Sequence, residues 1–133
     1  MPVTYTEILR TDCLGDSRAK INNNFNNFKS AVIALRAGVT GGTWTVNLGT
    51  MMPLSGSHCI GDSLLTINQN IALLKDSLQE IKTEAGSLLS GCSIEFDEIT
   101  QIAPNECIGD SRNKLNYIFD FLLSAHNCFD SYI

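Results

Sequence analysis

The chain has 133 residues, of which 44% are hydrophobic and 17% are charged, and its formal net charge is −5. That much apolar material supports a hydrophobic core in one domain of ordinary size and excludes disorder throughout the chain. The Lys and Arg residues form no cluster, so we expect no nucleic-acid partner, and no stretch is apolar for long enough to span a bilayer, so we expect no membrane role.

The cysteines favour a reducing compartment. There are five, an odd number that does not suit a closed set of disulfides. Residues 1–10 lack the basic head and apolar run of a secretory signal. We therefore expect synthesis in a cytosol and free thiols by default, although a particle that leaves the cell can still oxidise.

The first predicted element is a β-strand at residues 3–8, where β-branched and aromatic side chains are frequent. The string Cys-Leu-Gly-Asp-Ser follows at 13–17 and predicts the start of a helix. Its glycine permits a turn, and Asp16 or Ser17 can accept hydrogen bonds from the free N–H groups of the first turn. The helix is expected to stop at Gly38. Its apolar residues step by four and three, as along a heptad seam, which comprises Ile21, Phe25, Phe28, Val32 and Leu35.

The second unit repeats this order. A strand is predicted at 43–48, and the string returns at 59–63 with Asp62 and Ser63 as the capping residues. The helix is expected to continue through Leu88 to a stop at Gly91. Its seam comprises Leu64, Ile67, Ile71, Leu74, Leu78 and Ile81.

The third unit begins with an alternating segment at 93–99 that also predicts a strand. The string at 107–111 supplies Asp110 and Ser111 as capping residues. The helix that follows is apolar over a wider arc than the other two, so we expect it to be the most buried. Its seam includes Leu115, Phe119 and Leu122.

The three units predict an α+β fold dominated by helices, in a single domain of three strand-loop-helix repeats at approximately 1–40, 41–91 and 92–133. The repeated cysteines are 46 and 48 residues apart. Two architectures fit. The helices can form a parallel three-helix bundle around a pseudo-threefold axis within one chain, or each helix can meet its own copies in the coiled coil of a homotrimer. The narrow apolar stripe of the first helix slightly favours the homotrimer.

Three asparagines recur at one position of the repeat, directly after a seam residue: Asn22, Asn68 and Asn116. An exposed helix residue is the simpler interpretation of each. Because the asparagine is present in every unit, we favour a hydrogen bond to the loop of a neighbouring unit, in the same chain or in another.

Residues 61–64 spell Gly-Asp-Ser-Leu, which resembles the signature of a hydrolase family with a serine nucleophile. Such a serine needs a base and an oxyanion hole. The chain has only His58 and His126 as histidines, and a string that occurs three times is better explained by helix starts than by one active site. We therefore expect no catalytic residue, and we expect no cofactor. We expect no metal site either, because the cysteines and histidines lack the usual ligand spacing.

The sequence at 13–25, Cys-x-Gly-Asp-Ser-Arg-x-Lys-aliphatic-Asn-x-Asn-Phe, resembles repeats in structural proteins of tailed bacteriophages, such as tail fibres. The resemblance implies a non-enzymatic virion protein made in the host cytoplasm, commonly trimeric, with itself and other virion proteins as partners. The part can be a fibre, collar, baseplate or capsid component. Two alternatives stay open: a cellular binding or adaptor module with an intrachain bundle and, more remotely, a small hydrolase.

Overall fold

The computed structural model describes residues 5–9, 14–54, 60–96, 99, 102 and 108–133, and at 14–16, 60–62 and 108–110 it describes the backbone alone. This part of the chain contains three long α-helices, α1 (Leu14–Ala37), α2 (Ile60–Ala85) and α3 (Ile108–Tyr132). It also contains two short 3-10 helices, η1 (Leu48–Thr50) and η2 (Gly86–Leu89).

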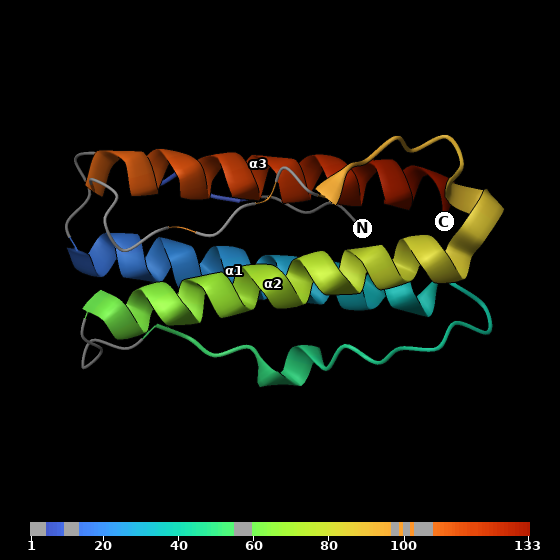
Figure 1. Ribbon diagram of the computed structural model, residues 1–133, viewed down its shortest axis with the longest axis horizontal. Helices are drawn as coiled ribbons and strands as arrows, with labels where there is room; N and C mark the ends of the chain where they lie inside the picture. Colours follow the sequence, from blue (N-terminus) through green and yellow to red (C-terminus); the bar gives the residue numbers. More distant parts are fainter. Residues whose placement is uncertain (1–4, 10–13, 55–59, 97–98, 100–101, 103–107) are drawn as a thin grey trace.

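The long helices lie side by side and run in the same direction (Figure 1). Each of them contacts the other two within the one chain. Because all three begin at the same end of the molecule, the chain returns along the bundle between α1 and α2 and again between α2 and α3. No helix in the described part of the chain is both long enough and apolar enough to cross a membrane.

Each long helix begins at the aliphatic residue of the repeated string, at Leu14, Ile60 and Ile108. An N-cap residue precedes the first helical residue, so the Gly-Asp-Ser of each string lies inside the first turn instead. The structure thus places all the predicted caps one turn inward of the N-cap: Asp16, Ser17, Asp62, Ser63, Asp110 and Ser111.

The predicted C-terminal end agrees with the structure for α1 but not for α2. Helix α1 ends at Ala37, next to the predicted stop at Gly38. Helix α2 ends at Ala85, short of the expected stop at Gly91, because Gly86 adopts a φ of 56° and the chain leaves the α-helix there. A left-handed glycine directly after the last helical residue is a common way to end a helix.

The described residues contain no β-strand, so the predicted α+β class is wrong for this part of the chain. The segments expected as strands run singly beside the helices. We call them the first strap (5–9), the second strap (43–54) and the third strap (92–96 with 99 and 102). Their backbone groups bond to helix side chains and not to another strand, as detailed below, and without such pairing no sheet exists.

The predicted heptad seams face the core of the three-helix bundle. Every predicted seam residue is buried within the single chain except Leu64, which is half-buried. Phe119 lies at the centre of an aromatic cluster, with ring centroids 5.3 Å from Phe25 and 5.9 Å from both Phe28 and Tyr5. Tyr5 belongs to the first strap, so this cluster joins the strap to α1 and α3.

Candidate functional site

The recurring asparagines, which we call the clamp asparagines, each bind the backbone of one strap residue through two hydrogen bonds. The side-chain oxygen accepts from the strap N–H, and the side-chain nitrogen donates to the carbonyl of the same residue. The pairs are Asn22 with Leu54 at 2.7 and 3.0 Å, Asn68 with Ile102 at 3.0 and 3.1 Å, and Asn116 with Ile8 at 3.0 Å for both bonds.

The three clamps follow one another around the bundle. Helix α1 binds the strap that precedes α2, helix α2 binds the strap that precedes α3, and helix α3 binds the strap that precedes α1. Each asparagine therefore bonds to a segment of another predicted unit, and it does so within the same chain. A carboxamide suits this position because it presents one acceptor and one donor, which is also what a peptide group presents in a β-ladder.

A second pair of asparagines repeats the contact within a unit. Asn24 bonds to both backbone groups of Thr6 at 2.7 and 2.8 Å, and Asn70 bonds to both of Met52 at 3.2 and 2.8 Å. Both asparagines are almost fully buried, at 0% and 2% exposed. Ile118 stands at this position in α3 and is also buried. Neither Asn24 nor Asn70 was predicted to have a role, although the spacing Asn-x-Asn in α1 and α2 was a signal for them.

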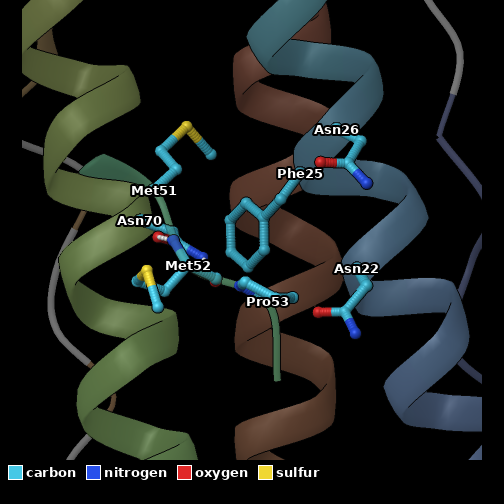
Figure 2. Close-up of a pocket in the computed structure, with 7 residues that line it drawn as sticks. All are labelled: Asn22, Phe25, Asn26, Met51, Met52, Pro53 and Asn70. Atoms are coloured by element: carbon cyan, nitrogen blue, oxygen red, sulfur yellow. Dashed lines mark hydrogen bonds between the residues drawn. The ribbon is translucent and has the colours of Figure 1, made fainter. Parts of the chain in front are cut away.

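Figure 2 shows how the second strap crosses between α1 and α2. Met51, Met52 and Pro53 lie between Asn22 on α1 and Asn70 on α2. A small cavity of about 140 Å³ remains here, lined by Asn22, Phe25, Asn26, Met51, Met52, Pro53 and Asn70. Asn22 and Asn70 at its edge are bonded to the strap, so these two polar groups of the cavity position that segment.

Farther along the bundle, charged groups bind the second strap. The guanidinium of Arg36 donates to the carbonyl of Val46 at 2.7 Å and lies 3.7 Å from Glu80. Glu80 accepts from the N–H groups of Thr45 and Val46, at 2.8 and 3.2 Å, and from the Thr45 hydroxyl. The Arg36 guanidinium also lies over the ring of Trp44, 5.5 Å from its centroid.

Burial and hydrogen bonding oppose each other at Glu80. Burial alone raises the pKa of this carboxyl group, but the hydrogen bonds from Thr45 and Val46 and the charge of Arg36 outweigh it. The pKa of Glu80 therefore lies below its ordinary value, and the group is ionised at neutral pH. An ionised Glu80 is the state that can accept every strap donor.

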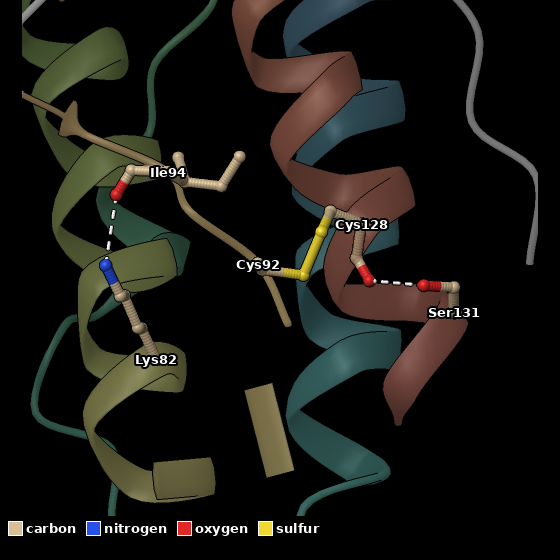
Figure 3. The surroundings of a disulfide bond; sticks show 5 residues. All are labelled: Lys82, Cys92, Ile94, Cys128 and Ser131. Carbon is tan, nitrogen blue, oxygen red and sulfur yellow. Dashed lines mark hydrogen bonds between the residues drawn. A yellow bond between two sulfur atoms is a disulfide. The ribbon is translucent and has the colours of Figure 1, made fainter. Parts of the chain in front are cut away.

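The third strap is bound by corresponding positions of α2 and α3. Lys82 donates to the carbonyl of Ile94 at 3.0 Å, as Arg36 does to Val46. Cys92 of the strap forms a disulfide with Cys128 of α3, with Cα atoms 5.9 Å apart (Figure 3). The expectation of free thiols is therefore wrong for this pair. The repeated residues Cys13, Cys59 and Cys107 lie outside the described residues.

The Gly-Asp-Ser strings do not assemble a described site with either histidine. Ser17, Ser63 and Ser111 are half-buried in the first turns of their helices, and His58 lies outside the described residues. His126 is 1% exposed, and it follows Ser111 by 15 positions along α3, or about 22 Å at the rise of an α-helix. It is thus near the opposite end of the bundle from all three serines.

His126 and Ser77 are the unusual members of the core. Burial lowers the pKa of His126, although the Asn127 side chain and the charge of Asp130 act in the opposite direction. The His126 Nε2 and the Ser77 Oγ are buried without a hydrogen-bond partner among the described residues. Both groups therefore weaken the core and do not bind a strap.

The described residues hold no group of three or more His, Cys, Asp or Glu side chains arranged to bind a metal ion. The contact that recurs in these residues is a hydrogen bond between a helix side chain and the backbone of a strap. No protein-family model, no curated protein and no solved structure matches this chain.

Proposed function

We propose that this chain is a non-enzymatic structural protein of a tailed-bacteriophage particle, part of a fibre, collar, baseplate or capsid. The observation that supports it most is the ring of clamp asparagines. The recurring polar residue of the phage-like motif makes the same backbone contact in every unit, and this contact fixes the straps around the helices. A motif selected for such contacts suits a protein whose task is to keep a shape.

The experiment is quantitative mass spectrometry of purified particles of the virus whose genome encodes this chain. We expect the chain in those particles at a fixed number of copies relative to the major capsid protein. Electron microscopy with an antibody against the chain then identifies the part. Recovery of the chain only from the infected cell, and never from particles that have been washed in high salt, contradicts the proposal.

The homotrimer is part of the same proposal, but it needs contacts other than those between the heptad seams of neighbouring chains. The heptad seams, through which a homotrimeric coiled coil would form, are buried within one chain except for the half-buried Leu64. A trimer therefore forms through the outer surfaces of the bundle or through other virion proteins. Light scattering of the purified chain distinguishes the 14.5 kDa monomer from a species of three times that mass.

A cellular binding or adaptor module is the second candidate, and the contacts among α1, α2 and α3 favour it. Such a module was expected to be an intrachain bundle, and the helices do pack within the chain. The two candidates differ in location and partner. Affinity purification from infected cells, followed by mass spectrometry, recovers virion proteins if the chain is structural and host proteins if it is an adaptor.

A further inference from the structure

The clamps show which residues of the first and second straps correspond. Ile8 and Leu54 are the residues that the clamp asparagines of α3 and α1 bind, and they are 46 residues apart. The repeated cysteines of the first two units have the same interval. On this alignment, Met51 of the second strap stands where Tyr5 stands in the first strap.

In the first strap, an aromatic ring fills this place. The Tyr5 ring packs against Phe119 of α3, with the ring centroids 5.9 Å apart. The Tyr5 hydroxyl donates to the carboxylate of Asp120, the next residue of α3. Burial raises the pKa of Tyr5, and the charges of Asp120 and Glu7 and the hydrogen bond to Asp120 raise it further. The tyrosine thus places its ring on a phenylalanine and its hydroxyl on a polar side chain.

In the second strap, a cavity lies at the corresponding place. Phe25 and Asn26 of α1 align with Phe119 and Asp120 of α3. Met51 supplies neither a ring nor a hydroxyl, and the cavity of about 140 Å³ has Phe25 and Asn26 in its wall. In Figure 2 the Phe25 ring lies between the two methionines of the strap and the carboxamide of Asn26. A cavity of about 150 Å³ in another protein is large enough to bind benzene.

The cavity has exposed residues at its rim. Asn26, Met52 and Pro53 are exposed, and the exposed fraction of Met52 is 61%. Phe25 is only 3% exposed, so its ring forms the floor. Methionine side chains are flexible and make favourable contacts with aromatic rings, so Met51 and Met52 can adapt to a ring that enters from outside.

The third strap lacks these features. Its residue at the place of Tyr5 is Ile99, and the aligned helix residues are Ile71 and Ala72 of α2. Aliphatic side chains can fill such a place, but they offer no hydrogen bond to a hydroxyl. Among the described residues, the second strap is therefore the one that lacks a ring although its helix supplies both a phenylalanine and a polar side chain.

We propose that this cavity binds a tyrosine side chain of a partner protein. Its ring packs against Phe25 as the Tyr5 ring packs against Phe119. Its hydroxyl donates to the carboxamide oxygen of Asn26, which stands in the place of the Asp120 carboxylate. An aromatic anchor in a pocket is a frequent centre of a contact between proteins.

The cavity is formed by this chain alone, so the inference does not rest on the virion proposal. Failure to find the chain in particles leaves it intact, and failure of the following experiment leaves the virion proposal intact.

The probe is N-acetyl-tyrosinamide, which carries the tyrosine side chain between two peptide groups. It is titrated into the full-length protein labelled with ¹³C at the methionine methyl groups. Met51 and Met52 line the cavity, so their methyl signals report a ring that enters it. Spectra of Met51→Leu and Met52→Leu assign the two signals.

We expect both signals to shift together and to saturate with a dissociation constant on the order of 1 mM, the range for a ligand of this size. N-acetyl-phenylalaninamide, which lacks the hydroxyl, should bind about fivefold more weakly, because the hydrogen bond to Asn26 is missing. N-acetyl-leucinamide, which lacks the ring, should cause no saturable shift. Equal binding of the tyrosine and phenylalanine probes, or no saturable shift with the tyrosine probe, overturns the proposal.

Two variants test the assigned contacts. Asn26→Ala should remove the preference for the tyrosine probe and leave the dissociation constant of the phenylalanine probe unchanged. Asn23→Ala is the matched control and should keep the preference, since Asn23 is an exposed residue of α1 that is not among those lining the cavity. Met51→Tyr copies Tyr5 and should block the probe by filling the cavity from within, with Met52 as the reporter. A preference that survives Asn26→Ala contradicts the proposal.

A last measurement tests whether the occupant is a tyrosine of a second copy of this chain, which has three tyrosines. The signals of Met51 and Met52 are recorded without probe over a range of protein concentrations. We expect them to stay constant. A change that matches the one caused by the tyrosine probe would overturn the assignment to a partner protein and show that a second copy enters the cavity.

Discussion

At the scale of the residue, a clamp asparagine supplies to a strap what a neighbouring β-strand would supply. It accepts from one backbone N–H and donates to the carbonyl of the same residue, as Asn22 does with Leu54. Aspartate has the same shape but no donor, and serine has a single short hydroxyl. The side chain at this position is thus restricted by both length and hydrogen-bonding capacity.

Removing one clamp should be costly. We expect Asn22→Ala to lower the free energy of unfolding by about 2–3 kcal/mol, because both backbone groups of Leu54 lose their partners in a partly buried site. Asn23→Ala is the control, since Asn23 is exposed in the same turn, and it should be neutral or slightly stabilising. Urea denaturation measures both, and equal effects would mean that the clamp contributes nothing specific.

Ser77→Ala should stabilise the protein. The Ser77 hydroxyl is 0% exposed and lacks a partner among the described residues, and the aligned residues of α1 and α3 are the buried Ala31 and Ala125. Removing the hydroxyl is expected to raise the free energy of unfolding by about 1 kcal/mol. Thermal denaturation measures the change. A loss of stability would indicate that the hydroxyl has a bonding partner.

His126 should make the protein sensitive to mild acid. Burial lowers its pKa in the folded state, whereas an unfolded chain has a histidine pKa of about 6.5. Below pH 6.5 the unfolded chain therefore binds a proton that the folded chain does not, so stability falls as the pH falls and is unaffected above that range.

His126→Leu, which copies the aligned Leu78, should remove this dependence. Between pH 7 and pH 5 the wild type is expected to lose more stability than the variant, by up to about 2 kcal/mol at 1.4 kcal/mol per pH unit. Urea denaturation at both pH values gives the difference. Parallel losses in the two proteins would contradict the assignment to His126.

At the scale of the element, the helices were predictable and the straps were only partly so. The four-three spacing of residues such as Phe25, Phe28 and Leu74 identifies the buried side of a helix whatever it packs against. Alternation at 93–99 identifies an extended segment with one buried side, but a strap over helices and an edge strand share that pattern. Only tertiary contacts distinguish them, and here the contacts come from asparagine side chains.

The end of α2 gives a prediction at this scale. Gly86 has a φ of 56° and no atom within 4 Å of the place where a Cβ atom would stand, so its requirement is conformational and not steric. We expect Gly86→Ala to lower the free energy of unfolding by about 1–2 kcal/mol. Ser87→Ala, at an exposed position of η2, is the control. A neutral Gly86→Ala would mean that the turn relaxes to another conformation.

At the scale of the whole molecule, the choice between an intrachain bundle and a homotrimer was beyond the sequence, because heptad spacing is the same in both. The narrow apolar stripe of α1 favoured the trimer. The stripe is narrow because one buried position of α1 holds a polar residue, Asn24, which binds the first strap. Cys92 and Cys128 have no counterparts in the other units, so the repeat gave no indication that they pair.

The disulfide should stabilise the fold as a whole. It joins residues 36 apart, and closing a loop of that length is worth about 3–4 kcal/mol in the chain-entropy model. Cys92→Ser is expected to lose about that much stability by urea denaturation, and the wild type in reductant should match it. If reductant leaves the wild type unchanged while Cys92→Ser is destabilised, packing at this position and not the covalent bond carries the effect.

The last clamp has a consequence for the order in which the chain becomes folded during synthesis. Asn116 and Ile8 are 108 residues apart, so their bonds form only after the chain has left the ribosome as far as α3. Helix α1 can bind the first strap earlier, through the hydrogen bonds between Asn24 and Thr6. The hydrogen bonds between that strap and Asn116 form only once α3 is present. Contacts between such distant parts of a chain form slowly, so we expect Phe25 and Phe28, which pack on Phe119, to stay open to water and to other chains until α3 has been made.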